Sequence, residues 1–307
     1  MTPMLAKPQQ LLLLVLPLWL LTGCSLKGMA INSLGNALAE AGTTYSSDED
    51  PELVAAAIPF ALKTIESLLA EAPEHEGLLY AAVSGFTQYA YAFVEQEADF
   101  AEDEDYRRAT QQRARAKRLY LRARGYGLRG LDVQFEGFAG KLREDPATAL
   151  AKTKREHVPL LYWTAAAWAA ATALSVDDSE LTADQFQVEA IMRRVLELDE
   201  RYENGSVHDF FLAFEAGRPS AAGGSTQRAR EHFERAMQLS RGLRAFPLVT
   251  AAESLAVAAQ DREEFEEMLQ QALAIDTDAM PEVRLANLVA QKRARWLLER
   301  TDEYFIE

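Results

Sequence analysis

Apolar side chains recur at intervals of three and four residues along most of this chain, the spacing of one face of an α-helix. The first such stretch lies between Pro51 and Pro73, and its apolar positions are Leu53, Ile58, Leu62, Ile65, Leu68 and Leu69. Acidic residues precede Pro51, and they favour a helix start because negative charge complements the helix dipole. We therefore predict a helix that begins at about Pro51 and ends before Pro73.

The same spacing predicts helices along the rest of the chain. We expect them at about residues 78–93, 106–126, 131–142 and 158–174. Gly125, Gly127 and Gly130 lie around the end of the third of these, and we expect them to interrupt the chain there because glycine disfavours helix interiors. No segment alternates between apolar and polar residues over several positions, so no sheet is expected. The sequence therefore predicts an all-α fold.

Two segments near the C-terminus resemble each other. Each places a small residue, Ala236 or Ala272, one turn after a large apolar residue, and Phe233 and Phe265 lie 32 residues apart. Tetratricopeptide repeats (TPRs) have a period near 34 residues, and each repeat buries its apolar face only by stacking on a neighbour. We predict degenerate TPR-like helical repeats that form a compact superhelical bundle.

The N-terminus predicts export and lipid attachment. The apolar run 11–21 is too short to span a membrane and has the length of a signal-peptide core. It ends in Leu-Thr-Gly-Cys, which resembles the bacterial lipobox and makes Cys24 the expected lipidation site. An ordinary cleaved signal peptide is the alternative. We expect a signal peptide at 1–23, a lipidated tether at 24–50 and the helical domain at 51–307.

The residue after Cys24 bears on which membrane is used. Aspartate at this place retains lipoproteins at the inner membrane in enterobacterial sorting, whereas this chain has Ser25. We therefore expect a periplasmic, lipid-anchored protein, with the outer membrane favoured. Cys24 is the one cysteine, so no disulfide framework is expected.

The strongly acidic composition excludes some partners. The formal net charge is -15. Removal of residues 1–23 would take away Lys7 and no acidic residue, making the mature chain more negative still. A surface of this charge repels nucleic acid and anionic lipid, so we expect no nucleic-acid partner.

The sequence carries little that indicates catalysis. Its four histidines show no short metal-ligand spacing with one another or with cysteine, and no nucleophile elbow or phosphate-binding loop occurs. We expect no catalytic residues, no metal and no cofactor. A periplasmic enzyme remains a weak alternative, because its residues could converge from positions distant in sequence.

Aromatic residues supply the candidate ligand positions. On a helix, Phe86, Tyr89 and Phe93 share a face. The full set of candidate ligand or pore-lining residues is Phe86, Tyr89, Phe93, Trp163, Trp168, Phe211 and Glu215. Core packing is the alternative for each aromatic member, because aromatic side chains at helical spacing usually lie inside. If several converge, they could line a pocket or pore between helices.

Three arginines form a candidate surface patch. Arg115, Arg118 and Arg122 share one face of the predicted helix at 106–126. They predict a site for a partner or an anion. The alternative is a solvated face whose charges are paired with nearby acidic residues.

Beyond these patterns, the chain resembles the TatT family, the TPR-type lipoproteins associated with tripartite ATP-independent periplasmic (TRAP) transporters. The resemblance covers nearly all of the mature chain. It rests on the lipobox and on the segments 50–53, 61–69, 84–90, 161–163, 214–219, 228–233 and 284–288.

The resemblance implies a non-catalytic component that binds the periplasmic substrate-binding protein of a TRAP system. It also implies a homo-oligomer, a trimer in the family's known example, with a channel through each protomer that could pass a small apolar or organic-acid ligand. The alternative is a TPR scaffold lipoprotein that organises outer-membrane or cell-wall assembly.

Overall fold

The computed structural model describes residues 31–37, 42–175 and 178–306, and every regular element in these ranges is helical. The predicted all-α fold is therefore confirmed, whereas its tetratricopeptide character stays a prediction. Cys24 and residues 1–23 lie outside the described residues. The longer helices are α3 (Pro51–Glu71), α4 (Glu76–Ala90), α6 (Tyr106–Gln134), α9 (Val158–Ala173), α11 (Gln185–Asp199), α12 (Ser206–Gly217), α13 (Thr226–Leu239), α16 (Arg262–Ala274) and α17 (Arg284–Leu298).

Shorter elements connect these helices. The short α-helices are 31–37, α2 (Gly42–Ser46), α5 (Gln96–Ala101), α7 (Phe138–Glu144), α8 (Pro146–Leu150), α10 (Ser179–Ala183), α14 (Phe246–Ala251), α15 (Val257–Ala259) and α18 (Thr301–Tyr304). The π-helical segments are η1 (Tyr91–Glu95) and η5 (Ala252–Ala256). The 3-10 segments are η2 (Arg155–His157), η3 (Tyr202–Asn204), η4 (Ser220–Ala222) and η6 (Pro281–Val283).

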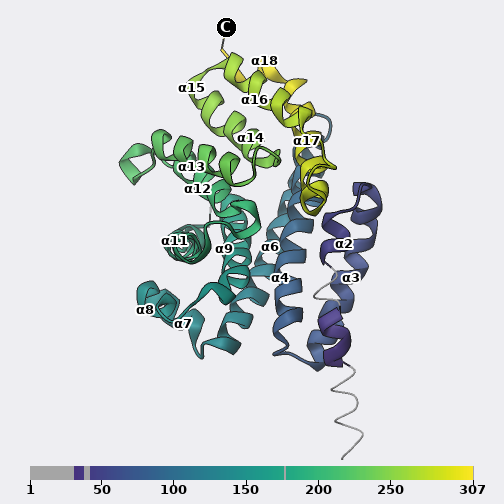
Figure 1. The fold of residues 1–307 in the computed structure, drawn as a ribbon, viewed down its shortest axis with the longest axis vertical. Coiled ribbons are helices and arrows are strands. Elements are labelled where there is room, and N and C mark those ends of the chain that lie inside the picture. The colour runs from purple at the N-terminus through teal and green to yellow at the C-terminus, as the bar shows by residue number, and fades with distance from the viewer. Residues whose placement is uncertain (1–30, 38–41, 176–177, 307) are drawn as a thin grey trace, which may run out of the picture.

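The helices pack in two connected groups (Figure 1). In the first, α4, α6 and α9 lie together, with α3 against α4 and α11 against α9. In the second, α14, α16 and α17 lie at the C-terminal end of the bundle. Helix α12 joins the two, because Phe211 belongs to the apolar cluster of the first group and Leu212 to that of the second.

Several helix ends lie where the sequence predicts them. Helix α3 begins at Pro51, and the Asp50 side chain accepts hydrogen bonds from the backbone N–H groups of Glu52 and Leu53. It ends at Glu71, just before the predicted break. The long apolar helix predicted at 158–174 is α9.

The predicted interruption near Gly125 is wrong. Helix α6 continues through all three glycines to Gln134, so the separate helix expected at 131–142 does not form. A β-carbon on Gly127 would lie 2.2 Å from Oγ1 of Thr164, and one on Gly130 would lie 3.0 Å from Leu160 Cδ2. Gly127 and Gly130 remove side chains from the face of α6 that packs on α9, and this tertiary contact outweighs their low helix propensity.

Helix α3 is the edge helix of the first group. Among the described residues it is the one helix long and apolar enough to cross a membrane by length and composition. Its buried stripe of Val54, Leu62, Ile65 and Leu69 faces the bundle, where it packs on α4. This packing accounts for part of its apolar character.

Candidate functional site

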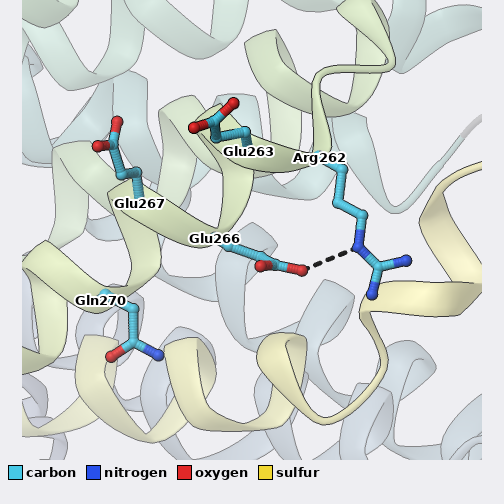
Figure 2. A pocket seen from close by; sticks show the side chains of 5 residues that line it. All are labelled: Arg262, Glu263, Glu266, Glu267 and Gln270. Carbon is cyan, nitrogen blue, oxygen red and sulfur yellow. Dashed lines mark hydrogen bonds and ion pairs between the residues drawn. The ribbon is translucent and has the colours of Figure 1, made fainter.

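One surface hollow lies along a single helix and has the features of an ordinary solvated face. Figure 2 shows its lining side chains, all of which come from α16: Arg262, Glu263, Glu266, Glu267 and Gln270. Arg262 Nε donates to Glu266 Oε1 at 2.9 Å, a contact between successive turns. Side chains from one helix cannot enclose a ligand, so this hollow is not a candidate binding pocket.

Helix α9 keeps one partly exposed face although it packs against α4, α6 and α11. Tyr162, Trp163 and Ala166 are partly exposed, whereas Leu161 and Ala165 on its other faces are fully buried. The Tyr162 ring lies 5.2 Å from the Trp163 ring and 5.3 Å from the Tyr202 ring. Aromatic side chains from α9 and η3 thus form a partly buried aromatic wall.

Glu203 stands on this wall in a strained backbone conformation. Its φ is 44° and its ψ 50°, and Asn204 also has a positive φ of 56°. Non-glycine residues in the left-handed region are disfavoured, and such strain clusters at functional sites. The Tyr202 hydroxyl donates to Glu203 Oε1 at 3.1 Å. The backbone is therefore held where it directs an acidic side chain toward the aromatic wall.

The surroundings of Glu203 are a group of polar and aromatic side chains. The residue is exposed to solvent, yet burial among protein atoms raises the pKa of its carboxyl, while Tyr202, Arg244 and Trp163 oppose that rise. Tyr80 lies beside Tyr202, and Tyr162 lies near Asp209 and Arg244. We use the name inner recess for this group of neighbouring side chains, which comprises Tyr80, Tyr162, Trp163, Tyr202, Glu203, Asp209 and Arg244.

A buried ion pair forms the floor of the inner recess. Arg244 Nη2 donates to Asp209 Oδ2, and the two side chains are 11% and 5% exposed. Burial opposes the charge on Arg244, but the Asp209 carboxylate outweighs it, and the pKa of Arg244 is raised. Arg244 Nη1, Asp209 Oδ1 and Trp163 Nε1 are buried without a hydrogen-bond partner among the described residues. Arg244 Nη1 and Asp209 Oδ1 are thus a donor and an acceptor left over inside the bundle, whereas the Trp163 side chain lies within hydrogen-bonding reach of Glu203 and Tyr80.

A second polar cluster lies beside the first. The Tyr91 ring packs edge-on against Phe246 at 5.7 Å, two residues beyond Arg244 in sequence. Arg293 Nη2 donates to Glu253 at 2.6 Å, and its Nη1 donates to Asp99 at 2.9 Å. Tyr91 belongs to η1 and Glu253 to η5, and π-helical turns are frequent at functional sites. Arg293 therefore links α17 to α5 and η5 through its two carboxylate partners.

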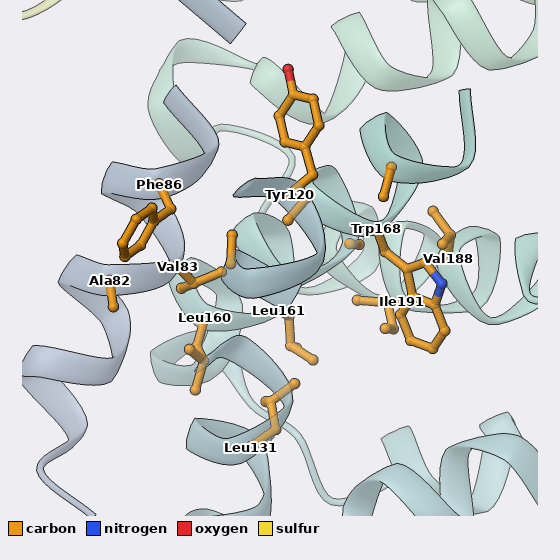
Figure 3. Packing of buried hydrophobic residues seen from close by; sticks show 14 of the residues in the cluster. Ala82, Val83, Phe86, Tyr120, Leu131, Leu160, Leu161, Trp168, Val188 and Ile191 are labelled. Carbon is orange, nitrogen blue, oxygen red and sulfur yellow. The ribbon is translucent and has the colours of Figure 1, made fainter. Parts of the chain in front are cut away.

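The predicted aromatic residues do not converge on one site. Trp163 alone borders the inner recess. Phe86 stacks on Tyr126 at 5.9 Å, and Tyr89 of α4 contacts Phe93 of η1 at the same ring distance. Trp168 lies among Val188 and Ile191 of α11, and Figure 3 shows it in the core on the far side from Phe86. We therefore expect most of them to contribute to packing.

Phe211 and Glu215 belong to a separate group on α12. The Phe211 ring stacks on His232 at 5.1 Å. Burial works against the charge on Glu215, but Arg228 and Arg218 outweigh it and lower the pKa of its carboxyl. This group joins α12 to α13 and does not reach the inner recess.

The three predicted arginines do share one exposed face of α6. Arg115 Nη2 donates to the Tyr89 hydroxyl at 3.2 Å, and Arg122 lies 3.6 Å from Glu66. No ion pair of the described residues involves Arg118. The part of the chain that the structure describes also contains no group of three His, Cys, Asp or Glu side chains placed to hold a metal ion.

Sequence reasoning missed Tyr162, Glu203 and Arg244, which border the inner recess with Trp163. They lie on α9, on η3 and in the segment before α14, so no local spacing relates them. The available signal was Asn204-Gly205, a pair typical of a tight turn. It marks the strained backbone but not the carboxylate that this backbone positions.

The fold and the inner recess define an all-α protein with buried polar and charged side chains in its interior. A family profile described as TRAP transporter T-component matches residues 47–305. An uncharacterized protein of Treponema pallidum (strain Nichols) is 30% identical over 306 residues, covering 94% of this chain and 95% of that protein. The chain belongs to the TRAP transporter T-component family. Membership associates it with a TRAP transporter and indicates a periplasmic or membrane-associated location.

Proposed function

We propose that this protein is a non-catalytic T-component that binds the periplasmic substrate-binding protein of a TRAP transporter and passes a small ligand through its interior. The observation that supports the proposal is the inner recess, in which aromatic rings lie beside the unpartnered polar atoms of Arg244 and Asp209. Aromatic surface suits an apolar body, whereas the polar atoms suit a head group such as that of an organic acid.

The path of the ligand follows from the polar clusters. It enters the inner recess along Trp163 and Tyr162 and continues past Tyr91 and Phe246 toward Arg293. The two π-helical segments border this path, and their wide turns change which side chains face inward. Phe86, Tyr89, Phe93, Trp168, Phe211 and Glu215 then support the wall rather than form it.

Lipid on Cys24 holds the protein in the periplasm, with the outer membrane favoured over the inner. One acyl chain anchors a protein weakly, whereas a processed lipoprotein carries two or three and remains attached. The protein acts as a homo-oligomer, with a trimer as the expected state. Each protomer then contributes its own recess.

A pull-down tests the partner. The full-length lipidated protein serves as bait in detergent-solubilised cells, and mass spectrometry identifies what it recovers. Recovery of a periplasmic substrate-binding protein supports the proposal. Recovery of outer-membrane or wall-assembly proteins without a binding protein favours the scaffold function.

A pair of tryptophan variants tests the recess. Native mass spectrometry of the protein purified from cells reports a bound small molecule. We expect Trp163→Phe to lose it and Trp168→Phe to keep it, because Trp168 lies in the core under Arg124. Equal retention by both folded variants would remove Trp163 from the ligand site.

A further inference from the structure

The outer face of α6 carries a line of exposed arginines longer than the sequence patch. The line, which we name the arginine ridge, consists of Arg108, Arg115, Arg118, Arg122 and Arg129. At 100° per residue these five positions fall within an arc of about 80°, and they extend over about 31 Å of helix. Only the unbroken course of α6 through its glycines joins Arg129 to the other four.

The arginine ridge is almost free of compensating charge. Among the described residues, no ion pair involves Arg108, Arg115, Arg118 or Arg129, and Arg122 pairs with Glu66 at 3.6 Å. Arginines on the other faces of α6 behave differently, since Arg113 pairs with Asp99 and Glu102. Helix α6 has no acidic residue before Asp132. The chain has a net charge of -15, so a row of arginines whose charges are mostly unpaired within the protein is unusual for it.

Three members of the ridge are held in place by aromatic rings. Arg115 lies 5.8 Å from the Tyr89 ring centre, Arg122 lies 5.5 Å from that of Phe86 and Arg129 lies 5.3 Å from that of Tyr126. Cation–π contacts restrict the guanidinium groups before any partner arrives. Less side-chain entropy is then lost on binding, which favours a docking role over a merely solvated face.

The arginine ridge runs along the side of the bundle. Gln134 at the end of α6 donates to Glu76 at 2.9 Å, and the neighbouring His75 contacts Asn32 at 3.4 Å. The Arg129 end of the ridge therefore lies at the same end of the bundle as helix 31–37. From there the ridge extends away from helix 31–37 for about 31 Å.

We propose that the arginine ridge is the docking surface for an acidic, carboxylate-bearing face of the periplasmic substrate-binding protein. The inference rests on the proposed function and specifies where that partner binds. Guanidinium groups form paired hydrogen bonds with carboxylates, and their long-range field speeds the encounter of oppositely charged surfaces. Docking on the side of the bundle leaves the end that carries helix 31–37 uncovered.

Two charge-matched variants test the ridge. The first is R108E/R118E/R129E, which changes three ridge arginines that form no ion pair. The control is R143E/K152E/R201E, which makes the same change in net charge at exposed positions outside the ridge that also form no ion pair. The baits are full-length and lipidated, and quantitative mass spectrometry compares what each recovers from detergent-solubilised cells. Circular dichroism and thermal unfolding confirm that both variants fold.

The expected result is at least a tenfold loss of binding protein with the ridge variant and less than a twofold change with the control. Equal recovery by all three baits would overturn the ridge while leaving the proposed function intact. If the wild-type bait recovers no binding protein, the proposed function fails and the inference fails with it. Ridge-dependent binding to vesicles containing phosphatidylglycerol, without loss of the binding protein, would assign the ridge to lipid instead.

The oligomer gives a further check. Analytical ultracentrifugation compares the wild type and both variants at equal concentration. An unchanged oligomeric state supports docking of a different protein on the ridge. Dissociation of the ridge variant with full retention of the binding protein would make the ridge a contact between copies of this chain and overturn the inference.

Discussion

Gly127 of α6 faces Thr164 of α9 so closely that a β-carbon on Gly127 would lie 2.2 Å from Thr164 Oγ1 and 2.9 Å from Thr164 Cβ. Rotation of the threonine side chain cannot relieve the second contact, because Cβ is fixed to the backbone. The Thr164 hydroxyl also donates to Leu160 O at 2.6 Å. The spacing of the two helices that support the inner recess thus depends on the absence of one methyl group.

Gly127→Ala should lower the free energy of unfolding by about 2 kcal/mol, since overpacking forces the helices apart. Gly125→Ala is the matched control, because no atom lies within 4 Å of the added β-carbon. It should raise stability by about 0.5–1 kcal/mol through better helix propensity. Urea unfolding measures both variants, and equal stabilities would contradict the close approach.

Arg244→Met should destabilise the fold by about 3 kcal/mol, because Asp209 would then be buried without its partner. The double variant D209N/R244M should recover at least half of that loss, since the uncompensated charge is gone. Arg155→Met provides the surface comparison. Arg155 pairs with Asp199 at 2.8 Å but is 74% exposed, so its loss should change stability by less than about 1 kcal/mol. If Arg244→Met and Arg155→Met changed the free energy of unfolding equally, the ion pair of Arg244 with Asp209 would be exposed to bulk water.

Glu203→Gly should stabilise the protein by about 1 kcal/mol, because glycine adopts positive φ without steric strain. The same change should abolish retention of a small molecule in native mass spectrometry, if the carboxylate serves the inner recess. Arg241→Gly, at an exposed residue with φ 55°, should give a similar stability gain without loss of the molecule. A destabilised Glu203→Gly variant would show instead that the carboxylate has a structural role.

The buried histidine pair predicts acid sensitivity. His208 Nδ1 and His232 Nδ1 lie 2.9 Å apart, and burial, with His232 beside it, lowers the pKa of His208 to about 4 from 6.5. Between these pH values His208 binds a proton in the unfolded chain but stays neutral in the folded chain. Stability should therefore fall by up to about 3 kcal/mol as the pH drops from 6.5 to 4.

His232→Gln tests the contribution of the pair. Glutamine retains hydrogen-bonding capacity but does not titrate, and it removes one of the charges that disfavour protonation of His208. The free energy of unfolding should then depend less steeply on pH between 7.5 and 5 than in the wild type. If the free energy of unfolding depends on pH equally steeply in the variant and the wild type, other groups cause the acid sensitivity.

The sequence determined the helical class and many helix ends, because these depend on residues close together in the chain. Asp50 and Pro51 begin α3 through a side-chain cap and a favourable first-turn residue, and Pro73 follows its end. The apolar segment at 158–174 predicted the helix that is α9 in the structure. The grouping of Arg115, Arg118 and Arg122 on one face also followed from helical spacing alone.

Only the tertiary structure decided what the glycines of α6 do and which residues meet inside. The low helix propensity of Gly127 alone predicts a break in the helix. Its close approach to Thr164 shows instead that it allows α6 to pack tightly on α9. That contact makes α6 continuous and extends the arginine ridge to Arg129. Glu203 and Arg244 border the inner recess from different elements, and their proximity arises from folding contacts between distant segments that local periodicity does not encode.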